Sequence, residues 1–585
     1  MGKPYTVEMA QLAGTYFWAR HVAVAPLVTA ISASGPFPLL ALGSGGSLTA
    51  ANIAVMLHQY HTGQIAKTVT PLELVRSAFD WHHAAVLVLS AEGKNADVIG
   101  AVNHVLMREP SCLSVLCMRL GSPLAALTRT YRFVDTVEYD LPSGKDGFLA
   151  TNSLLACSVI LCRAYAQAFS HSDGLPETLD SLLRESEDPD TQLGMDHLYQ
   201  QCSPLWTRST VLALHGMLTH AAAVDLESKF MEAALSNLHI ADYRNFAHGR
   251  HYWLARHGDT TAVLALIAEE DRDIADRTLR LIPAAVPVVR IDVPHWGMEA
   301  GLAALVLALQ IVNLAGIARQ VDPGRPGVPL FGRRIYRLKA FPKRGVIRTS
   351  ADAQRVAIER KAGVSVEALA ARGDFDVWRR AYATFVKGLQ RTSFGSIIFD
   401  YDGTICDREN RYLGLDAAVL GHLHRILDGG AIIGIATGRG KSVRDDLRRA
   451  LVENVWSRVF IGYYNGAENG RLDDNACPNA KALPCPTLAP IVRFLQEDPY
   501  VSAHTTCTYR RWQLTIEPGP QASRSTVWDV VQHIVLAAGQ AGVTAVRSSH
   551  SVDILAPGVS KRSLISTIGE SRRAFPVLCI GDQGL

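Results

Sequence analysis

The stretch Phe399-Asp400-Tyr401-Asp402-Gly403-Thr404 follows the apolar run 396–399. This order predicts a buried strand that ends in two carboxylates and a glycine turn. Two aspartates one residue apart at the end of a parallel strand suit metal-assisted phosphoryl transfer, because one carboxylate can attack phosphorus while the other handles the proton of the leaving group. Acidic turns are also common in solvated loops, so the prediction depends on the rest of the segment.

Three further segments follow in order, and each supplies a matching part. Segment 434–440 is a strand that runs into Thr437, whose hydroxyl can hold a phosphoryl oxygen or merely cap a helix. Lys561 stands at the start of a helical stretch, where its charge can neutralise a phosphoryl group or face solvent. Segment 579–582 ends in Asp582, a carboxylate suited to Mg²⁺, which prefers oxygen ligands.

These four segments resemble the motifs of the haloacid dehalogenase superfamily. The resemblance implies that Asp400 is a nucleophile that forms an aspartyl-phosphate and that Asp402 is the general acid/base. It implies that Thr437 and Lys561 bind the phosphoryl group. It also implies that Asp582 joins Asp400 and the main-chain carbonyl of Asp402 around Mg²⁺. An aspartate at the position of Asp402 goes with phosphatases and phosphotransferases rather than dehalogenases.

Roughly 120 residues separate Thr437 from Lys561, far more than one strand–helix crossover needs. This stretch resembles the inserted α/β cap of the sugar-phosphate and Cof-like phosphatases. Its candidate substrate contacts are Tyr509, Arg510, Arg511 and Gln513. The chain ends three residues after Asp582. The family supplies another aspartate, a strand and a helix beyond that point, so the domain is expected to be cut short.

A second informative region is 39–47, a short apolar strand followed by a glycine-rich loop and the helical run 48–61. Glycines let backbone N–H groups approach an anion, and the helix N-terminus adds its dipole. A second apolar strand, 84–90, ends in the polar loop 91–97 before another helix. A glycine-rich loop alone is often only a tight turn, so the pairing of two such loops carries the prediction.

The two loops resemble the phosphate-binding loops of the SIS (sugar isomerase) fold, which occurs in phosphosugar isomerases and regulators. Segments 211–223 and 261–276 repeat the pattern, as in the tandem isomerase half of glucosamine-6-phosphate synthase. The resemblance implies a phosphosugar-like ligand and a homodimer formed through these lobes. The implied ligand-binding residues are Gly43, Ser44, Gly45, Ser47, Ser90, Lys94 and Asn95.

Four positions depart from the synthase pattern. Glu92 stands where the family has a phosphate-binding serine, and Asn95 replaces a threonine. Asn245 stands in place of the catalytic glutamate, and Ala247 in place of a lysine. Without that glutamate, enolisation of a sugar by the family's route is not supported, and ligand binding is the stronger prediction.

Composition bounds the remaining possibilities. A chain of 585 residues predicts about three or four domains, and 48% hydrophobic with 19% charged residues is typical of soluble globular proteins. A net charge of +3 gives no reason to expect nucleic acid or an anionic membrane as a partner. Ten cysteines without a C-x-x-C pair and a polar N-terminus predict reduced thiols and a cytoplasmic protein. The apolar run 296–318 predicts a buried helix rather than a membrane span.

The predicted fold class is α/β. We expect two SIS-type doubly wound lobes at 1–200 and 201–345, a helical linker at 346–392, and a Rossmann-like haloacid dehalogenase core at 393–585 with an inserted α/β cap at about 442–556.

The predicted function is Mg²⁺-dependent hydrolysis of a phosphomonoester, a sugar phosphate or a related metabolite, beside a module that binds a phosphosugar-like ligand. Three alternatives stay open. The SIS lobes can be a non-catalytic sensor or scaffold that regulates the phosphatase, the chain can be a non-catalytic binding protein, or an isomerase can act through residues other than Asn245.

Overall fold

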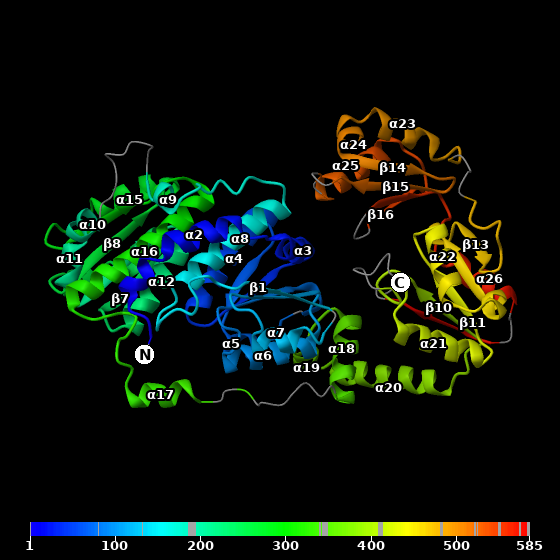
Figure 1. The fold of residues 1–585 in the computed structure, drawn as a ribbon, viewed down its shortest axis with the longest axis horizontal. Helices are drawn as coiled ribbons and strands as arrows, with labels where there is room; N and C mark the ends of the chain where they lie inside the picture. Colours follow the sequence, from blue (N-terminus) through cyan, green and yellow to red (C-terminus); the bar gives the residue numbers. More distant parts are fainter. Residues whose placement is uncertain are drawn as a thin grey trace. The chain divides into compact units, whose positions relative to one another are not determined.

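The computed structural model describes residues 2–79, 81–131, 133–184, 195–338, 341, 349–406, 414–479, 484–519, 522, 524–547, 551–571 and 575–581. The chain divides into two compact units, Met1–Tyr382 and Ala383–Leu585 (Figure 1). The boundary falls within helix α20 (Phe375–Arg391). Parallel sheets with helices along the chain confirm the predicted α/β class.

The first sheet of unit 1 has the strand order β2-β1-β3-β4-β5, and all its pairings are parallel. Strands β1 and β3 are buried along their whole length, as expected where helices cover both faces of a parallel sheet. Both begin in register, since Leu39 pairs with Ala85. The strands are β1 (Leu39–Leu42), β2 (Ala66–Val69), β3 (Ala85–Ser90), β4 (Cys112–Cys117) and β5 (Val134–Glu138).

The second sheet of unit 1 repeats the arrangement in the order β7-β6-β8-β9, again parallel throughout. The internal repeat in the sequence therefore corresponds to a second parallel sheet. Its two central strands, β6 and β8, coincide with the apolar runs of the repeated segments. The strands are β6 (Thr210–His215), β7 (Asn237–Asp242), β8 (Thr261–Ile267) and β9 (Val288–Asp292).

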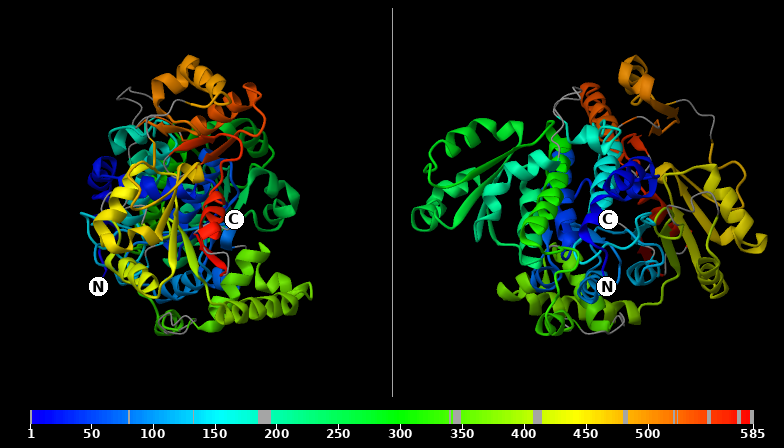
Figure 2. Two further views of the ribbon diagram at one scale, coloured as in Figure 1. Left: turned by 90° about the vertical axis from the view of Figure 1, so that its right-hand side faces the viewer. Right: turned by 60° about the vertical axis from the view of Figure 1, so that its left-hand side comes forward.

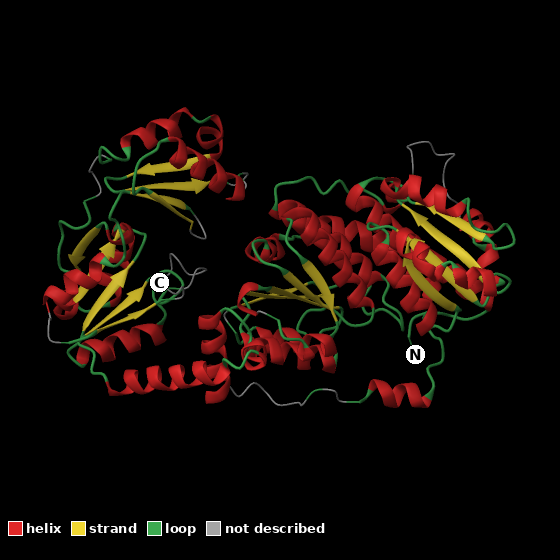
Figure 3. Ribbon diagram, turned by 180° about the vertical axis from the view of Figure 1, so that it is seen from behind, coloured by secondary structure: helices red, strands yellow, loops and turns green. Residues whose placement is uncertain are grey.

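A layer of helices separates the two sheets of unit 1 (Figures 2 and 3). Helix α4 (Gly46–Thr62) packs on α8 (Asn152–Ala168) and α12 (His220–Glu232), and α12 packs on α16 (Gly297–Arg319). One continuous apolar core joins these helices to both sheets. In the described part of the chain, α16 is the one helix long and apolar enough to cross a membrane, and 89% of its most apolar window is buried in this core, as predicted for the run 296–318.

Shorter helices complete unit 1. They are α1 (Tyr5–Met9), α2 (Leu12–His21), α3 (Ala25–Ser34), α5 (Pro71–Arg76), α6 (Ala96–Arg108), α7 (Pro123–Thr128), α9 (Leu179–Leu182), α10 (Met195–Gln201), α11 (Ser203–Trp206), α13 (Tyr243–Asn245), α14 (Tyr252–His257), α15 (Arg272–Leu279), α17 (Leu330–Tyr336), α18 (Ser350–Ala362) and α19 (Val366–Ala371).

The predicted helical linker is anchored to the first lobe over α18 and α19. Arg108, at the end of α6, donates to Glu359 Oε1 at 2.9 Å and to Glu367 Oε1 at 3.3 Å. Arg108 and Glu359 are almost completely buried. Because breaking a buried ion pair leaves an unpaired charge, this contact fixes α18 and α19 on unit 1.

The core sheet of unit 2 has the order β13-β12-β11-β10-β18, with only β13 antiparallel. Strand β10 lies between β11 and β18 and is parallel to both, so the carboxyl ends of these two strands flank its own. Helices α21 (Ala417–Asp428), α22 (Lys441–Ala450) and α26 (Ser563–Ser571) accompany this sheet. Its strands are β10 (Ser396–Asp400), β11 (Ile432–Ala436), β12 (Val459–Tyr463), β13 (Glu468–Arg471) and β18 (Val577–Ile580).

A separate antiparallel sheet, in the order β14-β15-β17-β16, has its own apolar core with α23, α24 and α25. The insertion starts later than the predicted residue 442, because β12 is a fully buried strand paired with β11 and therefore belongs to the core sheet. Its elements are α23 (Ala489–Glu497), α24 (Pro499–His504), β14 (Thr505–Tyr509), β15 (Gln513–Pro518), α25 (Arg524–Ala537), β16 (Thr544–Arg547) and β17 (Val552–Leu555).

Candidate functional site

The centre of the site in unit 2 is an ion pair between Asp400 and Lys561. Asp400 ends β10, and Lys561 lies in the turn between Gly558 and α26. The Lys561 ammonium donates to Asp400 Oδ1 at 2.6 Å. Both side chains are partly exposed, at 34% for Lys561 and 22% for Asp400. The structure therefore brings together two residues that stand 161 positions apart in the chain.

Asp402 lies beside this pair and is held by a second cation. The Arg439 guanidinium forms an ion pair with Asp402 Oδ1 and is only 8% exposed. Arg439 also lies 5.2 Å from the centre of the Tyr401 ring, within the range of a cation–π contact. The chain turns immediately after Asp402 at Gly403, whose φ of +84° favours glycine.

Tyr401 anchors the segment between the two aspartates. Its side chain is completely buried, and its hydroxyl donates to Asp446 on α22 at 3.2 Å. Since neighbouring residues of an extended chain point in opposite directions, burial of Tyr401 directs Asp400 and Asp402 to the other side, toward the sheet edge. This explains why a buried aromatic residue stands between two carboxylates.

Thr437 directly follows the neighbouring strand β11 and is completely buried. Its hydroxyl oxygen accepts from the backbone N–H of Arg439 at 3.0 Å, and its carbonyl accepts from Asn465 N–H at 2.8 Å. Asp400 pairs with Ala436, so Thr437 is one residue beyond the register position of the predicted nucleophile. Thr437 shapes the turn that presents Arg439 to Asp402.

The antiparallel sheet reaches this turn through Gln513. The Gln513 amide donates to Gly438 O at 3.4 Å and accepts from Asn465 Nδ2 at 3.2 Å. Asp553 on β17 is adjacent to Gly438 and is 7% exposed. Burial raises the pKa of Asp553, and its contacts with Thr515 and Gln513 only partly oppose this.

The two arginines of the turn between β14 and β15 differ in their surroundings. Both are candidate substrate contacts. Arg511 is exposed and lies 5.0 Å from the centre of the Trp512 ring. Arg510 lies 4.8 Å from the Tyr464 ring, next to the turn that carries Asn465. Arg510 therefore contacts the segment after β12, whereas Arg511 contacts its own neighbour in the chain.

Arg439 and Asp553 have no assigned role in the sequence-based prediction. Arg439 is inside the glycine-rich segment 434–440, but its partner Asp402 is 37 residues earlier. Asp553 is a lone acid within an apolar strand, and that unusual placement was the available signal. Neither partner can be found from spacing alone.

The predicted Mg²⁺ site is described only in part. Asp400 and Asp402 are oxygen donors of the type that Mg²⁺ prefers; Asp400 ends β10 and Asp402 lies two residues further on. Asp582, the third predicted ligand, lies outside the described residues. Within the described ranges no group of three or more His, Cys, Asp or Glu side chains is arranged to hold a metal. The two placed carboxylates fit Mg²⁺ by their chemistry.

Unit 1 contains a cavity of about 1100 Å³ at the carboxyl ends of β1 and β3. Its floor includes the two predicted loops, and Gly43 lies directly behind them. A Cβ at Gly43 would be 2.2 Å from Ser47 O, so the close loop packing requires glycine. The predicted residues that line the cavity are Ser44, Gly45, Ser47, Ser90, Lys94 and Asn95.

The polar groups of the second loop largely hold the loop itself. Asn95 Oδ1 accepts from the N–H groups of Asp97 and Val98 at the start of α6. Ser90 Oγ accepts from Gly93 N–H at 3.1 Å. These bonds set the loop's shape and leave ligand binding to groups around it.

Glu92 does not present an uncompensated negative charge. Lys94 and Arg119 donate to Glu92 Oε2 at 2.9 and 3.1 Å. Although partial burial acts to raise the pKa of Glu92, the hydrogen bond and charge of Lys94 and the charge of Arg119 outweigh it and lower that pKa. The repulsion of a phosphate expected from Glu92 is therefore reduced.

The opposite wall of this cavity carries charges that the sequence-based prediction missed. They come from the loop before α8, from α12 and from the segment after α16, so no sequence spacing links them to the glycine-rich loop. Lys229 among them is 2% exposed and is paired with Asp225. The charged residues are Lys145, Asp146, Lys229, Glu232, Arg325, Arg333 and Arg337.

No protein-family model matches this chain, and a search of curated proteins finds no match. Solved structures similar to it include the C-terminal domain of glucosamine-fructose-6-phosphate aminotransferase from Francisella tularensis, with 13% identity, a TM-score of 0.43 and coverage of 55% of this chain and 98% of that one. Tagatose-6-phosphate ketose/aldose isomerase from Escherichia coli has 13% identity, a TM-score of 0.41 and coverage of 55% and 97%. Glucosamine-6-phosphate deaminase from Thermotoga maritima has 13% identity, a TM-score of 0.42 and the same coverage. Each match leaves nearly half of this chain uncovered.

Proposed function

We propose that unit 2 is a Mg²⁺-dependent phosphomonoester hydrolase in which Asp400 is the nucleophile. The observation that carries this proposal is the contact of 2.6 Å between Lys561 and Asp400, next to the ion pair of Asp402 with Arg439. A carboxylate that attacks phosphorus needs a cation beside it, because the phosphoryl oxygens bring negative charge to the same place. Lys561 provides that cation.

In the first step Asp400 attacks phosphorus and the bond from phosphorus to the leaving oxygen breaks. Asp402, as the carboxylic acid, gives its proton to that oxygen, which leaves as an alcohol. The products are an aspartyl-phosphate at Asp400 and the carboxylate of Asp402. Arg439 stabilises this carboxylate through the ion pair seen in the structure.

In the second step Asp402 accepts a proton from water, and the water oxygen attacks phosphorus. The bond between phosphorus and Asp400 breaks, which releases inorganic phosphate and restores both carboxyl groups. Lys561 faces the phosphoryl oxygens in both steps. The carboxylates of Asp400 and Asp582 and the main-chain carbonyl of Asp402 would hold Mg²⁺, whose charge further offsets that of the phosphoryl oxygens.

For unit 1 we infer that the cavity at β1 and β3 binds a phosphorylated sugar or a related metabolite. Support comes from the glycine-rich loop, the helix N-terminus of α4 and the surrounding lysines and arginines. A phosphosugar module on the same chain as a phosphatase favours a sugar phosphate as substrate, by analogy between folds. The module can also serve as a sensor, in which case its ligand would change the rate of hydrolysis.

The test is phosphate release from a panel of sugar phosphates and nucleotides with and without Mg²⁺. Asp400→Asn is the inactive variant, and Asp428→Asn, an exposed aspartate on α21, is the matched control. We expect release that requires both Mg²⁺ and Asp400 and is unchanged in Asp428→Asn. Absence of release across the panel from folded protein, or equal release by Asp400→Asn, would contradict the proposal.

A further inference from the structure

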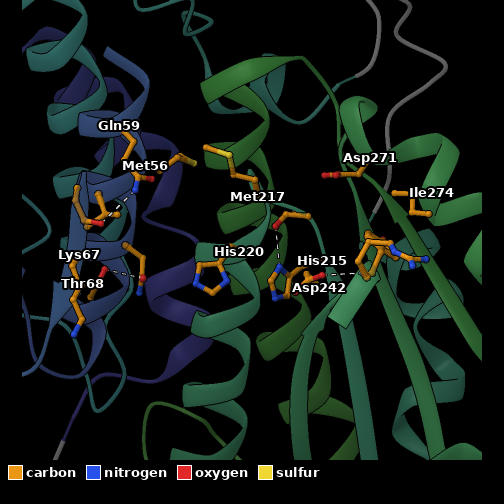
Figure 4. Close-up of a pocket in the computed structure, with 16 residues that line it drawn as sticks. Met56, Gln59, Lys67, Thr68, His215, Met217, His220, Asp242, Asp271 and Ile274 are labelled. Carbon is orange, nitrogen blue, oxygen red and sulfur yellow. Dashed lines mark hydrogen bonds between the residues drawn. The ribbon is translucent and has the colours of Figure 1, made fainter. Parts of the chain in front are cut away.

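A second cavity in unit 1, of about 580 Å³, lies at the carboxyl ends of β6 and β7 (Figure 4). His215 ends β6 and Asp242 ends β7, while α4 and β2 of the first lobe form the facing wall. The carboxyl ends of strands are where open α/β sheets bind ligands, and the volume is within the range of about 300–1,000 Å³ typical of small-molecule sites.

The loop after β6 differs from the glycine-rich loop of the first lobe in one decisive respect. The Asp271 carboxylate packs directly on Gly216, where a Cβ would lie 1.6 Å from Asp271 Oδ2. The Gly216 N–H donates to Thr219 Oγ1 at 2.9 Å, so it is already used within the loop. An anion at this loop would meet a carboxylate instead of backbone N–H groups. The loop after β6 is therefore unsuited to phosphate.

Two histidines form the centre of the cavity. The rings of His215 and His220 are 4.9 Å apart, and His215 is 6% exposed. Burial lowers the pKa of both, and for His220 the neighbouring His215 adds to the effect. His215 Nδ1 lies 2.9 Å from Gly216 O, so Nδ1 is assigned as the donor and Nε2 as an acceptor. Neutral imidazoles offer both donors and acceptors to a ligand.

The rest of the lining has the same mixed character. Asp242 uses Oδ1 to accept from the N–H groups of Arg244 and Asn245, while the first lobe contributes the amide side chains of Asn52 and Gln59. Met56 and Met217 add apolar surface. Lys67 and Arg244 also line the cavity, where their charges offset those of Asp242 and Asp271. Each hydroxyl of a polyol both donates and accepts, so this mixture of balanced charges, amides and neutral histidines matches a hydroxyl-rich molecule better than an ion.

We propose that this cavity is a second small-molecule site, which takes a neutral, hydroxyl-rich ligand such as a free sugar or a sugar alcohol. It is separate from the phosphate-directed cavity at β1 and β3. The chain then has two sites of different charge preference in one unit, and the second is independent of the hydrolase activity proposed for unit 2.

The test measures binding of D-glucose, D-fructose and sorbitol to the full chain by saturation-transfer NMR and titration calorimetry. Glucose 6-phosphate and inorganic phosphate are the charged comparisons. We expect at least one neutral compound to bind and the phosphates not to displace it. His220→Ala and Gln59→Ala, on facing walls, should each weaken its binding by about tenfold, the effect of losing one or two hydrogen bonds. Lys94→Ala, in the other cavity, should leave it unchanged.

Three results would overturn the proposal. They are no binding of any neutral compound at tens of millimolar, binding that resists both His220→Ala and Gln59→Ala, and displacement of the neutral compound by inorganic phosphate. Thermal unfolding of each variant shows that it is folded. Gln59 is exposed, so Gln59→Ala keeps the test decisive if His220→Ala disturbs α12.

Discussion

The site around Asp400 and Asp402 in unit 2 and the first cavity of unit 1 both lie at the carboxyl ends of parallel strands. The two sites differ in how their polar side chains are paired. In unit 2 each described carboxylate at the edge faces a cation, Asp400 with Lys561 and Asp402 with Arg439. In unit 1 the loop groups of Ser90 and Asn95 bond mainly to their own backbone. The same topological position can therefore support either chemistry or binding, depending on the side chains its loops carry.

The largest effect that would sharpen this contrast is expected at Lys561. Lys561→Ala removes the cation proposed to face the phosphoryl oxygens and should lower kcat by about 10²–10³-fold, as for other losses of transition-state charge stabilisation. Lys561→Arg should recover part of the rate because it restores the charge. Steady-state phosphate release measures both, and a Lys561→Ala enzyme with normal kcat would show that Asp400 does not need this partner.

A second contrast concerns Glu8, a carboxylate of unit 1 that is buried beside the cavity at β1 and β3. Glu8 accepts from the N–H of the lining residue Gly147, and its burial raises its pKa from 4.5 to about 7. The folded protein then binds more protons than the unfolded chain between these values, so stability falls as pH rises through the window. Glu8→Gln should remove this dependence and gain up to about 3 kcal/mol above pH 7 relative to the native chain.

Urea unfolding at several pH values, followed by a signal from unit 1, measures the Glu8 effect. Glu73→Gln on α5 is a suitable control, since the Glu73 side chain is 38% exposed and is paired with Lys67. Equal pH dependence in Glu8→Gln and the native chain would show that Glu8 is not titrating in this range.

The neighbouring arginines of the antiparallel sheet give the third comparison. Arg510→Ala should raise KM for phosphate esters by about tenfold, the size expected for loss of one charged contact. Arg511→Ala should change KM little, because Arg511 lies exposed on Trp512. The reverse order would mean that the substrate enters on the Arg511 side.

The smallest effects are expected in the first cavity of unit 1. Glu92→Gln should tighten binding of sugar phosphates by a few-fold, and Lys94→Ala should weaken it by a similar factor, since partly exposed ion pairs contribute about 1 kcal/mol or less. Calorimetric titration with glucosamine 6-phosphate and fructose 6-phosphate measures both. Binding that both variants leave unchanged would place the phosphate elsewhere in unit 1.

The order of apolar runs, glycine loops and helical stretches along the sequence predicted much of the fold. Apolar runs that end in glycine loops predicted β1, β3 and β10, because parallel strands covered on both faces must be apolar throughout. The predicted start of the cap at about residue 442 was too early, because a buried apolar strand such as β12 has the same composition in either sheet. Only its pairing with β11 decides to which sheet it belongs.

The sequence alone identified the candidate residues for reaction and binding. They are two aspartates at one strand end, a threonine before a glycine turn, and a glycine-rich loop before a helix. Their partners were decided by tertiary structure alone. Lys561 meets Asp400, Arg439 meets Asp402, and Lys229 reaches the cavity of the first lobe, across separations that carry no periodic signal. The physical reason is that sheet pairing and helix packing set these distances, and both depend on contacts between segments far apart in the sequence.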